Sequence, residues 1–304
     1  MNHRAPLFCQ RWRENRATYR PAGEIINTSD YEIAEISKAD AKIFVQAHHY
    51  SKSFPAARFC YGIFSRYVTP EHWNTYGLVP QLAGVAVYSV PRHPNVLTNV
   101  FPGDPNDSAE LGRFVLLNHL PLNCETYFIS RCNELLKRKG ILGVVAFADP
   151  NIRVQKNGNK ILSGHIGTIY SALGKSLFIG RSKPSYLHMF DDGTTLDPRA
   201  LSKIRNRESG FNYASNLLTS RGADEPWANP KLWLEHWLPK LTTRTRTQGT
   251  LKFTWPIGNR IIPRGRPLPY PKEFATVNEM IAAREKAANQ QPISRSESVD
   301  SDLQ

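Results

Sequence analysis

Apolar residues recur along this chain in short runs that are typical of β-strands. Longer runs lie at 57–64 (ARFCYGIF), 82–89 (LAGVAVYS), 110–117 (ELGRFVLL) and 141–148 (ILGVVAFA). The last run is almost continuously apolar, as expected of a central strand that is buried on both faces. Shorter strands are expected at 176–180, 186–190 and 250–255.

Apolar positions spaced three and four residues apart predict helices between these strands. The first helix follows Ser37, which can cap it together with Asp40, and ends near His49. The second runs from its expected cap, Asn123, to about Lys139. Further helices are expected at 167–173, 198–207 and 230–238. The alternation of strands and helices predicts the α/β class (α+β, with a mixed sheet flanked by helices).

Pattern and composition divide the chain into three parts. Residues 1–30 carry five arginines and little periodicity, so we interpret them as a basic N-terminal arm. Residues 31–270 are expected to form one catalytic domain, and 271–304 a C-terminal tail with a disordered end. Because no run of about 18 apolar residues occurs and the N-terminus lacks an apolar signal segment, we expect a cytoplasmic protein without a membrane span.

The charge balance indicates a polyanionic partner. Lys and Arg number 39 against 26 Asp and Glu, a net charge of +13, and binding to phosphates releases condensed counterions. The alternatives are general solubility or a tail without a specific role. Between Lys240 and Tyr270 seven basic residues and no acidic one interleave with aromatic rings, which is typical of a surface that tracks phosphates and stacks on bases. The residues assigned to DNA are Arg244, Arg246, Lys252 and Trp255.

Two short motifs hold candidate site residues in the first half of the chain. In the segment HHYS, which ends with Ser51, one histidine and the Tyr50 hydroxyl can accept or donate a proton; alternatively the histidine caps the helix and the tyrosine packs. On the strand at 110–117, Glu110 and Arg113 point to opposite faces unless a bulge at Gly112 intervenes. Arg113 can pair with a structural carboxylate or contact a phosphate or ribose.

Two more motifs follow the buried strand. Asp149 comes directly after it, where the ends of strands in open α/β sheets face ligands; it can orient or deprotonate an amine, or form an Asx turn. In the segment 164–170 (GHIGTIY), His165 and Thr168 would be neighbours on a helix, with a buried histidine as the alternative. The four cysteines lack metal-ligand spacing, so we expect reduced thiols and assign no metal ligand.

The order of these motifs resembles the Mom family of phage DNA-modification proteins. The resemblance spans about residues 31–255 and rests most of all on HHYS and on ADP followed by GHxGTIY. That family is similar in fold to GNAT acetyltransferases and converts adenine in DNA to its N6-carbamoylmethyl derivative, which shields phage genomes from restriction. The resemblance implies DNA adenine as the substrate and acetyl-CoA or a related thioester as the donor, although the GNAT pyrophosphate-loop pattern is absent here.

Carried over residue by residue, the resemblance implies a set of site residues. The catalytic candidates are Asp149, Tyr50, His165 and Tyr170, and His49 is added to them from the HHYS motif itself. The cofactor-binding candidates are Glu110, Arg113, Asn123 and Thr126. We expect Arg113 and the backbone amides at the start of the helix after Asn123 to hold the phosphates of the donor. We expect Asp149 to hydrogen-bond or deprotonate the adenine amine of a flipped base, with Tyr50 or a histidine as its partner and Tyr50 or Tyr170 stacking on the base.

Two other functions are compatible with the sequence. One is a GNAT-type acyltransferase that acts on a protein or small-molecule amine. The other is a non-catalytic DNA-binding protein with the same fold. A modified deoxyadenosine in cellular DNA would distinguish adenine modification from both of these alternatives.

Overall fold

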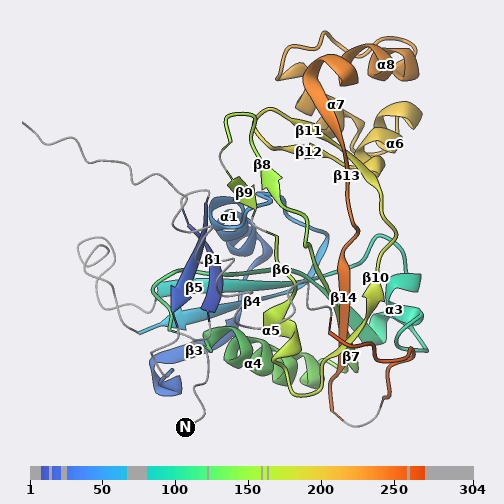
Figure 1. Ribbon diagram of the computed structural model, residues 1–304. Coiled ribbons are helices and arrows are strands. Elements are labelled where there is room, and N and C mark those ends of the chain that lie inside the picture. The colour runs from blue at the N-terminus through green and yellow to red at the C-terminus, as the bar shows by residue number, and fades with distance from the viewer. Residues whose placement is uncertain are drawn as a thin grey trace, which may run out of the picture.

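A seven-stranded mixed sheet forms the body of the protein (Figure 1). The computed structural model describes residues 8–13, 16–21, 26–66, 81–121, 123–158, 160–162, 164–258 and 261–270. The strand order is β10-β14-β7-β6-β5-β4-β3. The strands are β3 (Tyr31–Glu35), β4 (Ala57–Ser65), β5 (Gln81–Ser89), β6 (Ser108–Leu116), β7 (Gly143–Ala148), β10 (Leu177–Arg181) and β14 (Leu251–Pro256).

Within this sheet β6 and β7 are parallel, whereas the other neighbours are antiparallel. A parallel pair needs a crossover connection, and helix α4 (Cys124–Arg138) provides it. The predicted mixed α/β class is therefore confirmed.

Helices cover both faces of the sheet. On one face α1 (Lys38–His48) packs Ala41 and Val45 against Val87 and other residues of β5. On the opposite face α4 buries Phe128 and its neighbours against the largest apolar cluster. Burial on both faces explains why β7 lacks the alternating pattern of a half-exposed strand.

The ends of the two helices differ from each other. The Ser37 hydroxyl accepts a hydrogen bond from the Asp40 amide (3.0 Å), so the predicted cap of α1 is confirmed. Asn123 precedes α4 as predicted, but its backbone is left-handed (φ 72°) and its side chain makes no capping hydrogen bond. The predicted capping role of Asn123 is therefore wrong.

Residues 186–246, which we call the lobe, build a second sheet and a second core beyond the ends of β10 and β14 (Figure 1). The core gathers around Phe190, Ile204, Leu218 and the fully buried Trp233. This separate core was not predicted within the single catalytic domain expected at 31–270. The lobe consists of β11 (Tyr186–Phe190), β12 (Thr195–Leu196), β13 (Thr242–Arg246), α6 (Pro198–Asn206), α7 (Phe211–Thr219) and α8 (Pro230–Leu241).

The N-terminal segment contains an antiparallel hairpin of β1 (Phe8–Arg13) and β2 (Arg16–Pro21), which the pattern of an irregular arm did not predict. The predicted tail at 271–304 lies outside the described residues. Short elements complete the fold: η1 (Thr28–Asp30), α3 (Asn95–Thr98), η3 (Pro105–Asp107), β8 (Arg153–Val154), β9 (Lys160–Leu162) and α5 (Thr168–Ser171). In the part of the chain that the structure describes, no helix is long and apolar enough to cross a membrane.

Candidate active site

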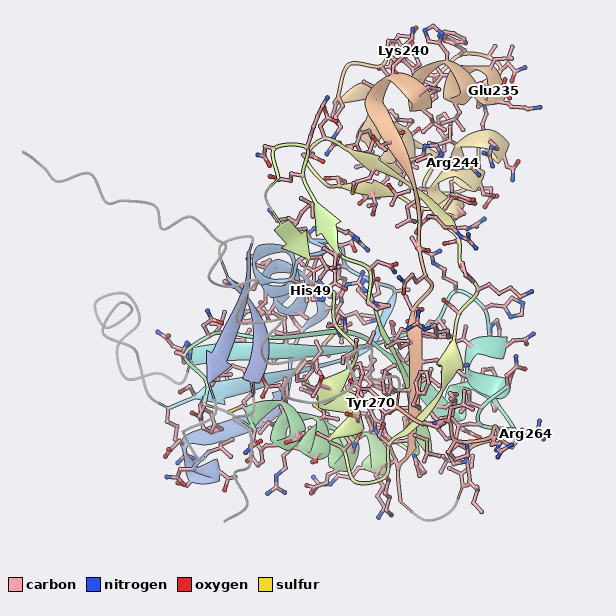
Figure 2. All side chains as sticks on the ribbon, viewed as in Figure 1. His49, Glu235, Lys240, Arg244, Arg264 and Tyr270 are labelled. Atoms are coloured by element: carbon pink, nitrogen blue, oxygen red, sulfur yellow. The ribbon has the colours of Figure 1, made fainter. Side chains whose placement is uncertain are left out.

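The predicted catalytic residues meet where β6 and β7 part. The two strands pair from Ser108 opposite Gly143 to Leu111 opposite Ala146, and the pairing stops there although both strands continue. Asp149 follows β7 directly, and the HHYS segment begins with the last residue of α1, which packs on this sheet. In the view of Figure 2, His49 lies below Arg244 of the lobe, above Tyr270 of the body and to the left of both.

A bulge at Gly112 decides which way the β6 side chains point. Arg113 lies opposite Val87 and Leu111 lies opposite Tyr88, so Gly112 is one residue in excess over β5. The extra residue turns Glu110 and Arg113 to the same face. The bulge therefore brings together two side chains that a regular strand would separate.

The Arg113 guanidinium is held by the protein itself. Its Nε donates to the Ser53 carbonyl (2.9 Å), its Nη2 to the Ser53 hydroxyl (2.7 Å) and its Nη1 to the Gly112 carbonyl (2.6 Å). Burial lowers its pKa, while Tyr50 and Glu110 nearby oppose that shift. Because its nitrogens are engaged in these bonds, Arg113 orders the loop after α1.

A row of hydroxyls leads from Arg113 to His49. The Ser53 hydroxyl donates to the Ser51 hydroxyl (3.2 Å), which lies 2.9 Å from Nδ1 of His49. The Ser51 backbone amide also donates to this Nδ1 (3.1 Å). Ser53 had no signal in the sequence, because nothing local marks a serine that contacts an arginine 60 residues away.

His49 is a neutral hydrogen-bond donor in this arrangement. The residue is 8% exposed, and burial, with Arg113 and His165 nearby, holds its pKa well below the usual 6.5. Since Nδ1 accepts the Ser51 amide proton, the proton of the neutral ring belongs on Nε2. The donor role is thus favoured over the acceptor role that the sequence left open.

His165 has the same character. Its Nε2 accepts the Asp149 amide (3.3 Å), while its own amide donates to the Asp149 carbonyl (2.8 Å). Burial lowers its pKa, with the Asp149 carboxylate opposing the shift, so the ring proton belongs on Nδ1. Because α5 begins only at Thr168, the prediction that His165 and Thr168 share a helix face is wrong.

The Asp149 carboxylate is engaged at both oxygens. Oδ1 accepts from the Asn151 amide (3.0 Å) and from Asn151 Nδ2 (2.7 Å), which is the Asx turn left open above. Oδ2 pairs with Arg153 at 2.7 Å, and the two side chains are 15% and 21% exposed. These contacts favour an anchoring role for Asp149 over proton transfer.

Two tyrosines enter the cluster from opposite sides. The Tyr50 ring lies 4.2 Å from the His49 ring, and its pKa is raised by burial and by Asp149. The Tyr170 ring packs in the core, and burial raises its pKa, with Tyr50 and Glu110 close enough to add to the effect. Both phenols are therefore protonated at neutral pH. Because the Tyr170 ring is buried against Phe253 and Trp255, the prediction that it stacks on a flipped base is wrong.

Glu110 differs from the other charged groups of the cluster. Among the described residues no hydrogen bond or ion pair engages its carboxylate. Burial raises its pKa, while Arg113, Arg92 and Lys252 oppose that shift. A half-buried carboxylate with an elevated pKa and no fixed partner is suited to accept a proton.

Trp255 and Lys252 do not form a surface for DNA bases. Trp255 is 2% exposed; its ring stacks on Tyr170 (5.9 Å between centroids), and its Nε1 donates to Asn133 (3.2 Å). The predicted base-stacking role of Trp255 is wrong, because β14 is an inner strand whose side chains line the core. Lys252 donates to the Val96 carbonyl (3.3 Å) and faces Glu110, so it belongs to the cluster.

The predicted cofactor-binding residues separate into two groups: Glu110 and Arg113 share one face of the sheet, whereas Asn123 and Thr126 do not join them. Asn123 and Thr126 lie at the start of α4, where the Thr126 hydroxyl donates to the Asn123 carbonyl (3.2 Å). Phe114, which contacts α4 through Phe128, neighbours Arg113 in the strand and points to the opposite face. The prediction that Arg113 and the start of α4 together form a phosphate site is therefore wrong.

In the described portion of the chain, no group of three or more His, Cys, Asp or Glu side chains is placed to hold a metal ion. Cys60, Cys124 and Cys132 are free and buried thiols, as predicted. Cys9 lies in a segment whose side chains are outside the description.

Two solved structures, an acetyltransferase and a tandem GNAT protein, are similar to the chain. The ribosomal-protein-S5-alanine acetyltransferase from Vibrio fischeri has a TM-score of 0.31 and 12% identity, over 56% of this chain and 90% of that chain. A tandem GNAT protein from the clavulanic acid biosynthesis pathway has a TM-score of 0.35 and 10% identity, over 75% of this chain and 99% of that chain.

The family is defined by sequence. The model of the Mom protein family matches residues 30–224, more than half of the 304 residues, and the chain therefore belongs to the Mom protein family. No curated protein matches the sequence.

Proposed function

We propose that this protein transfers a group to the N6 amine of adenine in DNA, forming N6-carbamoylmethyladenine and protecting phage DNA from restriction. Membership of the Mom protein family supports the substrate class. The observation that carries the proposal is the presence, around Arg113, of one carboxylate without a fixed partner, Glu110, and of two neutral imidazole donors, His49 and His165.

These groups complement the edge of adenine. The base presents the N6 amine as a donor next to N1 or N7 as an acceptor, so a carboxylate that accepts and an imidazole that donates match its two groups. The base must leave the helical stack to reach such a partly buried site. His49 and His165 are held in place by the Ser51 and Asp149 amides, which fixes the donor direction before the base arrives.

Proton removal is the chemical requirement that the site meets. The lone pair of the exocyclic amine is delocalised into the ring, so the amine becomes an effective nucleophile only as its proton leaves. Glu110 accepts this proton, since its raised pKa makes it a stronger base than an exposed carboxylate. Asp149 holds Arg153 and Asn151 in place, and Tyr50 flanks the base.

The donor expected from the resemblance is an acetyl-CoA-type thioester, which supplies an activated acyl carbon. The residues assigned to its phosphates do not fit it, because Arg113 is bound by Ser53 and lies on the opposite face of the sheet from Thr126. We therefore derive no step that involves this donor. The conversion of an acyl group into a carbamoylmethyl group likewise needs chemistry beyond the residues described.

The test compares two carboxylate variants in cells that carry reporter DNA. Glu110→Gln should abolish modified adenine, because the amide cannot accept the proton, whereas Asp149→Asn should reduce it, because one oxygen remains to hold Asn151. Glu134→Gln, at an exposed position on α4, is the matched control and should leave modification unchanged. Full modification by Glu110→Gln would exclude Glu110 as the proton acceptor.

A further inference from the structure

The lobe carries a cluster of cations around an exposed ring. The Arg244 guanidinium lies over the Tyr186 ring, 3.8 Å from its centroid, and Tyr186 is 45% exposed. Arg246 lies directly opposite Tyr186 on the neighbouring strand and is exposed. Side chains paired in this register share one face of the sheet, so both arginines and the tyrosine point the same way.

A histidine and a third arginine extend this cluster. His188 is paired with Arg244 in the strand register, and its Nδ1 lies 3.0 Å from the Thr242 hydroxyl. Burial lowers its pKa, and the charges of Arg244 and Arg205 lower it further. Arg205 is exposed on α6, and its charge acts on the same imidazole. We call Tyr186, His188, Arg205, Arg244 and Arg246 the lobe face.

The lobe face has excess positive charge. Within the described ranges no carboxylate forms an ion pair with Arg205, Arg244 or Arg246. Other acidic residues of the lobe are engaged elsewhere: Glu208 with Arg199, and Asp192 with Arg221. Three arginines left together at a surface repel one another unless an anion joins them, so the face is complementary to a polyanion.

The lobe is fixed to the body next to the candidate active site. Between β13 and β14 the Thr247 amide donates to the Ser185 carbonyl (2.8 Å), which keeps the two connecting segments together. The Gln248 amide donates to Asn151 Oδ1 (2.8 Å), and Asn151 Nδ2 donates in turn to Asp149. One asparagine thus links the base of the lobe to the carboxylate of the site.

From this arrangement we infer that the lobe face binds the phosphate backbone of duplex DNA beside the adenine to be modified. The inference rests on the proposed function for the identity of the polyanion. Arginines with exposed guanidinium groups contact phosphates without reading sequence, and the contact with the Tyr186 ring limits the positions open to the Arg244 guanidinium. Because Asn151 joins the lobe to Asp149, a backbone held on the lobe face lies at a set distance from the site.

The experiment measures how duplex binding depends on salt. Each phosphate contact contributes about 0.9 to the slope of log K against log salt concentration, so Arg205→Gln, Arg244→Gln and Arg246→Gln together should lower the slope by about 2.7. The matched control is Arg131→Gln, Lys137→Gln and Arg138→Gln, three exposed cations of α4. Fluorescence anisotropy with a labelled duplex of unrelated sequence gives the slope for each protein.

The outcomes distinguish DNA binding by the lobe face from adenine modification at the candidate active site. A slope lowered for the lobe variant and unchanged for the α4 variant supports the inference, whereas equal loss in both, or no loss in either, overturns it. Should the triple variant misfold by circular dichroism, Arg205→Gln alone decides, with an expected loss of about 0.9. Glu110→Gln should bind duplex DNA with the wild-type salt slope. The binding result can therefore be interpreted even if no modified adenine is found. If the lobe variant binds duplex DNA with the wild-type salt slope and still modifies adenine, the inference about the lobe face is wrong and the proposed function stands.

Discussion

Stability at mildly acidic pH tests the assignment of His49 as a neutral donor. In the unfolded chain the imidazole has its ordinary pKa near 6.5, whereas in the folded protein burial, Arg113 and His165 hold that pKa well below 6.5. The unfolded state therefore binds more protons as the pH falls. The resulting stability is fully present above pH 6.5 and is lost as the pH drops toward the folded pKa.

The magnitude follows from proton linkage. For one imidazole that stays neutral in the folded state, lowering the pH from about 7.5 to about 5.5 costs about 1.4 kcal/mol of unfolding free energy. His49→Asn removes this titration and keeps an acceptor near Nδ1 for the Ser51 amide. The variant should therefore lose about 1.4 kcal/mol less than the wild type over the same pH interval.

Urea unfolding followed by tryptophan fluorescence at several pH values measures this difference. His93→Asn is the matched control, since His93 is exposed and also accepts a backbone amide at Nδ1, from Asn95. If the wild type and His49→Asn lose equal stability on acidification, the folded protein takes up a proton at His49 as readily as the unfolded chain. The neutral-donor assignment would then be refuted.

Two further variants probe the supports of the site and the lobe. Gly112→Ala should destabilise the protein by about 1–3 kcal/mol and lower modification, because a Cβ there would lie 2.3 Å from the buried Ser89 hydroxyl oxygen; thermal unfolding and modified adenine both report it, and a fully active, fully stable variant would contradict the account of the bulge. Asp224→Ala should loosen α8 and raise the fluorescence change on mild heating, since this carboxylate accepts indole hydrogen bonds of 2.9, 2.9 and 2.6 Å. The donors of these three bonds are Trp227, Trp233 and Trp237. An unfolding transition of the lobe that is unchanged in Asp224→Ala would argue against this role of the carboxylate.

The body of the fold was largely predictable from the pattern. The strands at β4, β5 and β7 and the helix α4 begin or end within a few residues of their expected limits, because each buries an apolar run or stripe. The ends of α1 and β7 place the HHYS segment and Asp149 as the pattern predicted, whereas the direction of the Glu110 side chain depends on the bulge at Gly112, which the sequence left open.

The errors share a physical cause. An amphipathic helix has the same pattern whichever core it covers, so α6 and α8 were expected while the separate core around Trp233 was not. An aromatic residue between cations has the same spacing whether it is exposed, as Tyr186 is, or buried, as Trp255 is. Which partners Arg113 binds depends on a loop 60 residues earlier, and no local pattern contains that contact.

The central claim is that the cluster around Glu110, His49 and His165 modifies adenine in DNA. Mass spectrometry of nucleosides, digested from the DNA of cells that express the wild-type protein, tests it most directly. The account predicts a deoxyadenosine heavier by one carbamoylmethyl group, present with the wild type and absent with Glu110→Gln. Unmodified deoxyadenosine in DNA from wild-type cells, with an acetylated protein or small amine in its place, would contradict it.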